Sequence, residues 1–182
     1  TLTYGNTVFS SPFDVPELEK RTLVVSSISK SHAIPGFRSG WIAASAEFCD
    51  RCIPVTETML FGSQPFIEDA LAFALDNHFP ELDAMKRDYE ARARALVASL
   101  KGSAKVSARM PDGGMFIMVD VRKTGLSGEA FAHRLLEEEG VVTMPGESFG
   151  AGGSGHLRVA LTVDEAQITE ACKRIVRLAE SI

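Results

Sequence analysis

The chain has 182 residues, of which 45% are hydrophobic and 24% are charged, and its formal net charge at pH 7 is −5. This is the composition of a globular domain or of a piece of a larger protein, and it argues against nucleic-acid binding, since the net charge is negative and no basic stripe carries interleaved aromatic residues. No apolar run approaches the length of a membrane span, and the first residues lack the pattern of a signal peptide, so we expect a cytoplasmic protein that does not bind membranes.

The cysteines do not suggest a disulfide framework, because their number, three, is odd, and this fits a reducing compartment. Cys49 and Cys52 form a C-x-x-C pair, and Cys172 stands alone. A zinc or redox site would need a second pair of ligands, or a thioredoxin-like strand and turn around the pair, and neither is visible. We therefore predict no metal site and interpret the pair as two cysteines at the start of a helix, one of them buried.

The first half of the chain predicts two short strands and then three helices. Residues 22–27 and 40–45 are apolar runs of strand length. Three helices are expected after them: 47–60, kinked or broken near Pro54; a second within 62–78; and a third that begins at Pro80 and stops at Gly102.

The second half changes in texture and predicts a compact α+β arrangement. Its elements follow the order β-β-α-β-β-α. A PDGG turn joins the first two strands, Ser127 caps the first helix, Gly140 ends it, and a capping box from Thr162 to Glu165 opens the last helix. The expected strands are 105–110, 115–121, 141–146 and 156–163, and the expected helices are 127–140 and 162–182.

The stretch 24–41 carries the residues that suggest chemistry. Lys30 ends an apolar run among serines, and Arg38 follows across a loop. A lysine attacks an aldehyde once desolvation or nearby cations lower its pKa, and an arginine with hydroxyls suits a phosphate. Pyridoxal 5'-phosphate carries both groups, so Lys30 would hold the aldehyde as a Schiff base, and Ser27, Ser29 and Arg38 would hold the phosphate. Taken alone, these residues also fit an ordinary surface loop.

The sequence SSISKSHAIPGFRSGW, residues 26–41, resembles the signature of the class I/II, fold-type I aminotransferases. In that signature, S-x-S-K is followed by a short loop that ends in G-x-R-x-G-[WY]. Lys30 falls on the Schiff-base lysine, and Ser27 and Arg38 fall on the phosphate-binding serine and arginine. A bound cofactor would thus explain why the two cations occur in one short stretch.

Three further stretches resemble the same family, so the resemblance covers the whole chain. Residues 111–121 resemble a P-x-G-[GA]-x-F strand, and residues 141–150 resemble a P-G-x-x-F-G turn near the substrate. Residues 155–162 resemble the strand whose arginine, Arg158 here, grips the substrate α-carboxylate through a planar, bidentate guanidinium. The glycines of 150–155 also match G-x-G-x-x-G, but a strand follows them, so we interpret them as a loop and not as a dinucleotide site.

The resemblance implies an α/β fold that combines part of a large domain with a small domain. Residues 1–80 would be the C-terminal part of the pyridoxal-phosphate-binding large domain, residues 81–103 a long connecting helix, and residues 104–182 a small α+β domain. Relatives carry a glycine-rich phosphate loop, a stacking aromatic residue and a D-x-x-Y motif upstream of the matched segment. We therefore expect this chain to be the C-terminal part of a longer enzyme, and to be inactive alone.

The implied function is a pyridoxal-phosphate-dependent transaminase that moves an amino group from an L-amino acid to a 2-oxo acid. Lys30 would carry the proton between the substrate Cα and the cofactor. Members of the family are homodimers with shared sites, and Ser63 and Gln64 are candidates to face a partner's site. Within the family, residues 38–70 are similar to arginine–pyruvate transaminases, with a broad aspartate or aromatic transaminase as the other option.

Three alternatives remain open from the sequence. The first is another enzyme on the same scaffold, such as a β-lyase, a decarboxylase or a synthase, because the lysine and arginine motifs are shared. The second is a non-catalytic, aminotransferase-like effector domain. The third is an α+β domain that binds no cofactor.

Overall fold

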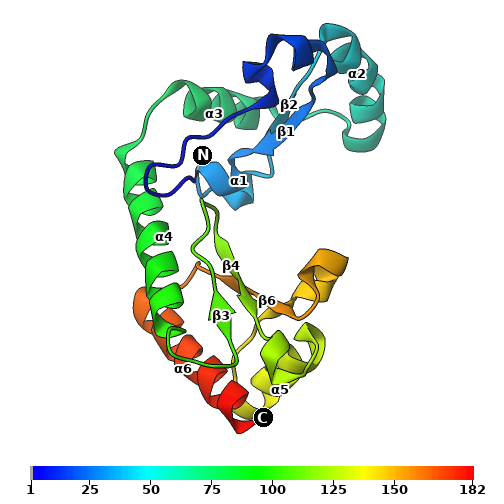
Figure 1. The fold of residues 1–182 in the computed structure, drawn as a ribbon. Helices are drawn as coiled ribbons and strands as arrows, with labels where there is room; N and C mark the ends of the chain where they lie inside the picture. Colours follow the sequence, from blue (N-terminus) through cyan, green and yellow to red (C-terminus); the bar gives the residue numbers. More distant parts are fainter. Residues whose placement is uncertain (1) are drawn as a thin grey trace. The chain divides into compact units, whose positions relative to one another are not determined.

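The computed structural model describes residues 2–182, and these residues form two compact units. Unit 1 consists of residues 8–83, and unit 2 consists of residues 84–182 together with residues 2–7 (Figure 1). The helix α4 (Pro80–Ser99) begins in unit 1 and continues into unit 2. The other helices and strands of unit 1 are β1 (Val24–Ser27), α1 (Ile28–Ser31), β2 (Gly40–Ala43), α2 (Ala46–Leu60) and α3 (Pro65–Asp76).

The two strands of unit 1 form an antiparallel pair, with Ser27 opposite Gly40. A Cβ atom at Gly40 would lie 2.4 Å from the carbonyl oxygen of Ser26, so only glycine allows the strands to approach this closely. Both strands were predicted, and so was a helix after them. This helix was predicted to be kinked or broken near Pro54, and the break was wrong, because α2 runs as one helix through that residue.

Unit 2 contains a four-stranded antiparallel sheet in the order β3-β4-β6-β5. Its element order, β-β-α-β-β-α, confirms the order predicted for the second half of the chain, and the mixed α/β architecture is also as predicted. The elements are β3 (Ser107–Ala108), β4 (Phe116–Asp120), α5 (Gly128–Glu139), β5 (Met144–Pro145), β6 (His156–Ala160) and α6 (Glu165–Ser181).

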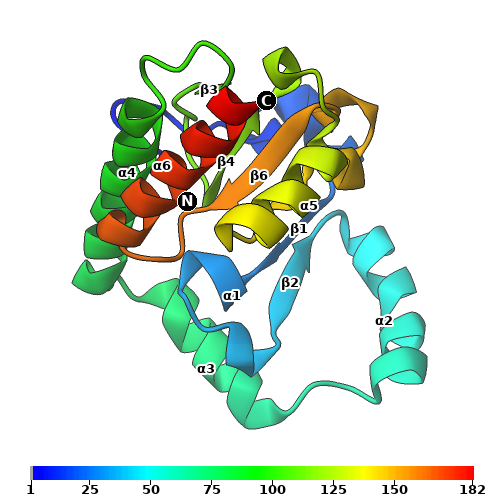
Figure 2. The ribbon, with the colours of Figure 1, turned by 90° about the horizontal axis from the view of Figure 1, so that it is seen from below.

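One face of this sheet builds the core of unit 2. Side chains alternate along β4 and β6, so Ile117, Val119, Leu157 and Val159 point to one face and are buried, while their neighbours point to the other. The helices α5 and α6 contact each other, and in Figure 2 both lie in front of β6. The helices bury apolar side chains in the same core, among them Leu96 of α4, Phe131 and Leu135 of α5, and Ile168, Ile175 and Leu178 of α6.

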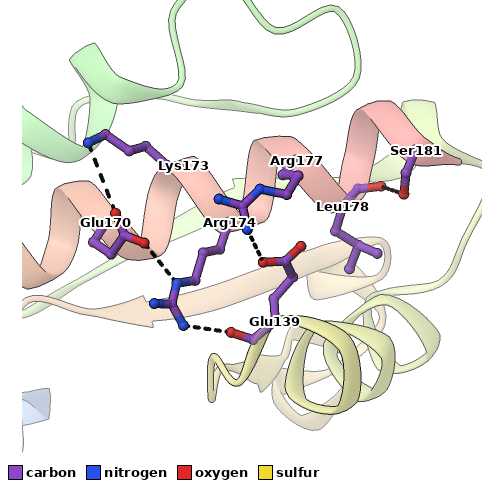
Figure 3. Close-up of polar contacts among 7 residues, drawn as sticks. All are labelled: Glu139, Glu170, Lys173, Arg174, Arg177, Leu178 and Ser181. Carbon is purple, nitrogen blue, oxygen red and sulfur yellow. Dashed lines mark hydrogen bonds and ion pairs between the residues drawn. The ribbon is translucent and has the colours of Figure 1, made fainter.

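Arginines of α6 hold the end of α5 (Figure 3). Arg174 donates from Nη1 to the carbonyl oxygen of Glu139 at 2.9 Å, and from Nε to the Glu170 carboxylate at 3.0 Å. Arg177 donates to the Glu139 carboxylate at 2.9 Å. Glu139 is the last residue of α5, so the guanidinium of Arg174 satisfies a carbonyl that the helix itself leaves unpaired. This clamp fixes the position of α5 on the unit.

The N-cap of α5 is the one predicted from the sequence, and the N-cap of α6 is not. Ser127 caps α5 by accepting a hydrogen bond from the backbone N–H of Ala130, and Gly140 ends that helix with a left-handed backbone, as predicted. The predicted cap of the last helix was wrong. Asp164, and not Thr162, is the N-cap of α6, because its carboxylate accepts from the backbone N–H of Gln167 at 2.8 Å.

The segment 2–7 is bound to unit 2 through Tyr4. This side chain is buried, and its hydroxyl donates to the carbonyl oxygen of Gly114. Burial raises the pKa of Tyr4 to about 12, so the phenol stays protonated at neutral pH. The backbone of the segment also pairs with the turn at Asp112 and Gly113.

Two sequence predictions concern absent features. Among the helices formed by residues 2–182, none has both the length and the apolar character required to cross a bilayer. Within the same residues, no group of three or more His, Cys, Asp or Glu side chains lies where it could hold a metal ion.

Candidate functional site

Lys30 lies on α1, a single helical turn that follows directly from β1. Ile28 and Ser29 of this turn are buried, and Ser29 retains only 8% of its exposure. Lys30, the next residue, is exposed. The buried pair anchors the turn to unit 1, and the amine that follows is left accessible to a ligand.

The serines around Lys30 differ in what they contact. Ser27 occupies the N-cap position of α1, but its side chain makes no capping hydrogen bond. Ser31 donates from Oγ to the carbonyl oxygen of Ser27 at 3.2 Å, and its Oγ lies 2.9 Å from Nδ1 of His32. The His32 ring meets Phe79 edge to face, with centroids 6.4 Å apart. His32 is thus packed as part of the loop, while the Ser27 hydroxyl is not used to cap the turn.

Arg38 follows a one-turn 3-10 helix, η3 (Pro35–Phe37), which contacts α1. Its backbone is left-handed, with φ of +50°, a conformation that costs a residue other than glycine about 1 kcal/mol. The guanidinium is exposed and donates from Nη1 to the carbonyl oxygen of Pro35 at 2.9 Å. The turn that carries Lys30 and the turn that precedes Arg38 are therefore neighbours in unit 1.

The donor set in this part of unit 1 fits a phosphorylated aldehyde. It comprises one primary amine, several hydroxyls and one guanidinium. Within residues 2–182, neither Lys30 nor Arg38 takes part in an ion pair, so neither cation is already neutralised by a carboxylate of the described chain.

A cavity of about 530 Å³ lies elsewhere in unit 1. Trp41 of β2 and Cys49, Cys52 and Ile53 of α2 are among the residues that line it, and Lys30 and Arg38 are not. The wall is mainly apolar, so this cavity does not provide the charges that a phosphate requires. Both of its cysteines are free thiols, and both are half-buried, so the prediction that one of them is buried was wrong.

Arg158 lies on β6 of unit 2, on the face of the sheet opposite to the core. Its carbon Cζ is 5.2 Å from the ring centroid of Phe116 on β4 and 4.6 Å from that of Phe149. In the part of the chain that the structure describes, no carboxylate forms an ion pair with Arg158. The guanidinium is oriented by aromatic rings, and its hydrogen-bonding edge remains available for an anion.

Sequence reasoning found Arg158 but missed the residues that hold it. Phe149 lies in the predicted P-G-x-x-F-G turn, so its place in a motif was a signal, but its contact with Arg158 is tertiary. Phe116 reaches Arg158 only because β4 pairs with β6. Glu147 carried no signal at all, although its carboxylate ties the same turn to α5.

The family model of aminotransferase class I and II matches residues 2–175. The chain belongs to this family. The matched range includes Lys30, Arg38 and Arg158, and the resemblance inferred from the motifs is confirmed at the level of the family.

Relatives of this aminotransferase chain are similar over nearly its whole length. The arginine–pyruvate transaminase of Pseudomonas aeruginosa is 42% identical over 172 residues, which are 94% of this chain and 44% of that protein. The aromatic aminotransferase from Pyrococcus horikoshii superimposes with a TM-score of 0.93 at 25% identity, over 99% of this chain and 48% of that one. A probable N-succinyldiaminopimelate aminotransferase from Thermus thermophilus gives 0.88 at 30% identity, over 97% and 46%. The chain thus spans about half the length of the relatives it matches.

Proposed function

We propose that the complete protein is a pyridoxal-phosphate-dependent transaminase that moves an amino group from an L-amino acid to a 2-oxo acid. The observation that carries the proposal is the arrangement in unit 1, where an exposed Lys30 follows a buried anchor and the neighbouring turn leads into Arg38. Membership of the aminotransferase family supports it.

In this proposal the residues of unit 1 hold the cofactor. Lys30 would hold the aldehyde carbon through its amine, and Arg38 would hold the phosphate through its planar fork, with Ser27 and Ser29 as hydroxyl donors. When bound, pyridoxal 5'-phosphate supplies an electron-withdrawing ring that makes the Cα proton of an amino acid acidic. Exposure of Lys30 and Arg38, and the Ser27 hydroxyl that makes no capping bond, support these roles.

The same residues account for the proton movement. The Lys30 amine would act as a general base toward the substrate Cα and then as a general acid that returns the proton. Arg158 binds the α-carboxylate, because a guanidinium fixes a carboxylate bidentately and so fixes the orientation of Cα. The aromatic contacts of Arg158 and its lack of an ion-pair partner within residues 2–182 support this role.

We propose arginine as the amino donor and pyruvate as the acceptor. The support is the 42% identity to the arginine–pyruvate transaminase of Pseudomonas aeruginosa, which covers 94% of this chain. A broader donor range that includes aspartate or aromatic amino acids is the second candidate, and the similarity to an aromatic aminotransferase supports it.

We also propose that the protein is a cytoplasmic homodimer. The three free cysteines fit a reducing compartment. Ser63 and Gln64 are both exposed at the start of α3, so they are accessible to a second copy of the chain. Sedimentation of the complete protein would test the dimer, and fractionation of its native cells would test the compartment.

The proposed role of Lys30 is tested by trapping the attached cofactor. The complete protein is mixed with pyridoxal 5'-phosphate, reduced with borohydride and digested, and the labelled peptide is located by mass spectrometry. We expect the label on Lys30, loss of label and of amino transfer in Lys30→Ala, and wild-type behaviour in the control Lys20→Ala. Label on another residue, or none, would refute the proposal.

The substrates are tested by product analysis. We expect arginine and pyruvate to give alanine and a 2-oxo acid derived from arginine. Ammonia and pyruvate formed from a single amino acid would instead identify a lyase, and carbon dioxide would identify a decarboxylase.

A further inference from the structure

Glu147 lies in the loop between β5 and β6, and its carboxylate joins three parts of unit 2. Its Oε1 accepts hydrogen bonds from the backbone N–H of Gly128 and from that of Gly155, each at 2.9 Å. Gly128 is the first residue of α5, and Gly155 directly precedes β6. One carboxylate oxygen therefore ties the loop to a helix and to a strand.

These bonds are charge-assisted. The backbone N–H of Gly155 and other backbone donors hold the pKa of the Glu147 carboxyl below its usual range, so the group is ionised at neutral pH. Its Oε2 is buried and has no hydrogen-bond partner among residues 2–182. The negative charge lies at the N-terminus of the twelve-residue helix α5, where the helix dipole favours it.

Glycines make this junction too tight for any side chain. A Cβ atom at Gly128 would lie 2.3 Å from the carbonyl oxygen of His156 and 2.5 Å from Oε2 of Glu147. Within the loop, a Cβ at Gly146 would lie 2.0 Å from the carbonyl oxygen of Gly153. Backbone packs directly against backbone at these points. The loop between β5 and β6 is therefore closely packed and has no room for another conformation.

The tied segment contains the aromatic partner of Arg158. Phe149 follows Glu147 by two residues, and Arg158 follows Gly155 by three. The Phe149 ring lies 4.6 Å from the Arg158 guanidinium. The hydrogen bond from Gly155 to the Glu147 carboxylate therefore joins the segment that carries Phe149 to the segment that carries Arg158.

We propose that Glu147 is a positioning residue, which holds the loop so that Phe149 keeps Arg158 oriented for a carboxylate ligand. The inference rests on the proposed role of Arg158 as the residue that binds substrate carboxylate. A free arginine loses substantial rotamer entropy when it binds a ligand. An arginine that is already held against an aromatic ring loses less, so the ligand binds more tightly.

The test measures carboxylate affinity apart from catalysis. Propionate, a carboxylate without an amino group, is titrated by calorimetry into the complete protein saturated with pyridoxal 5'-phosphate. We expect Arg158→Ala to abolish binding and Glu147→Ala to weaken it about tenfold, the scale of a lost hydrogen bond to a charged group. We expect about a threefold loss for Glu147→Gln, which keeps an oxygen acceptor without the charge.

Two further variants separate positioning from other effects. Phe149→Leu should lose as much affinity as Glu147→Ala, and the double variant should lose no more than the larger single loss, because both changes act through one contact. The control Glu129→Ala removes an exposed carboxylate from the first turn of the same helix and should bind as wild type. Hydrogen exchange of peptides that cover residues 145–158 should rise in Glu147→Ala and not in the control.

Several results would overturn the inference. They are wild-type propionate affinity in Glu147→Ala, additive losses in the double variant, an equal loss in Glu129→Ala, or binding that does not depend on Arg158. If Glu147→Ala does not fold, Glu147→Gln decides by the same criterion of affinity. The borohydride label on Lys30 tests the proposed function independently. A failure of the role proposed for Glu147 can therefore be distinguished from a failure of the proposed function.

Discussion

The two units of this chain carry different parts of the proposed site, and they differ in how much apolar core supports those parts. Unit 2 has a continuous apolar core, which includes buried residues from three helices and two strands. Among the described hydrophobic residues of unit 1, only Ile28 and Ala74 are buried. Many large apolar side chains of unit 1 are exposed, among them Val8, Phe9, Val25, Ile42, Phe61 and Phe66.

Lys30 and Arg158 therefore depend on different sources of rigidity. Arg158 is held by contacts within its own unit, namely Phe116, Phe149 and the strands on either side. The turn that carries Lys30 is anchored by its two buried residues, Ile28 and Ser29. We therefore expect the stability of unit 1 to depend on contacts outside the described chain, since exposed apolar surface of this extent contributes nothing to its own folding.

Replacing one phenylalanine in each unit should change the free energy of unfolding by very different amounts. Phe131→Ala removes a ring that is 0% exposed in the core of unit 2 and should lower the free energy of unfolding by about 4 kcal/mol. Phe61→Ala removes a ring that is 95% exposed and should change it by less than about 0.5 kcal/mol. Urea unfolding of the 182-residue chain, followed by circular dichroism, measures both. Equal losses would remove the contrast between the units.

The second comparison lies within unit 2 and concerns its tight loop. Gly146→Ala would place a Cβ 2.0 Å from the carbonyl oxygen of Gly153, and a backbone atom cannot move aside without displacing the loop. We expect a loss of about 2 kcal/mol, as for other overpacked sites. The matched control is Gly152→Ala, since a Cβ there meets no atom of the described chain within 4 Å. Thermal unfolding that ranks the two variants equally would show that the loop is not closely packed.

Much of the fold of unit 2 follows from local sequence. Ser127 and Gly140 delimit α5 because a hydroxyl at the N-cap and a left-handed glycine at the end act within one turn of the helix. The strands of the sheet follow from alternation of apolar residues. The start of α6 was misplaced because Thr162 and Asp164 are both good caps two residues apart, and the sequence alone does not rank them.

The residues of the candidate site that belong to a sequence motif could be predicted. Those whose importance comes from tertiary contacts could not. Lys30, Arg38 and Arg158 stand in recognisable motifs, and their roles stay predictions. Glu147 was invisible, because a glutamate in a loop reads as a solvated charge until Gly128 and Gly155 are brought to it by the fold. Pro54 misled for the opposite reason, since the usual cost of an internal proline suggested a break that α2 does not have.

The third prediction tests the corrected cap of α6. Asp164→Ala removes the acceptor for the backbone N–H of Gln167 and should cost about 1 kcal/mol. Thr162→Ala should cost less than about 0.5 kcal/mol, because Thr162 lies outside the cap. Urea unfolding at neutral pH distinguishes them. A larger loss from the threonine variant would restore the capping box predicted from the sequence.

The smallest expected effect is a pH dependence that belongs to unit 2. The Arg122 side chain donates to both oxygens of Asp120, from Nε at 3.0 Å and from Nη2 at 2.6 Å, and this lowers the pKa of Asp120 to about 2. The unfolded chain binds the proton at higher pH than the folded chain. The ion pair therefore contributes its full stability above the ordinary carboxyl pKa and loses it as the pH falls toward about 2.

Asp120→Asn should therefore flatten the acid limb of the stability curve between about pH 5 and about pH 2. The effect is small because Arg122 is exposed, so solvent screens the pair. The matched control is Asp88→Asn, which removes an exposed carboxylate that forms no ion pair within residues 2–182. The free energy of unfolding of both variants is measured in urea at each pH, with hydrogen exchange in peptides of β4 as the readout. If Asp120→Asn keeps the wild-type slope, the Arg122 contact does not stabilise unit 2, and the core alone accounts for its stability.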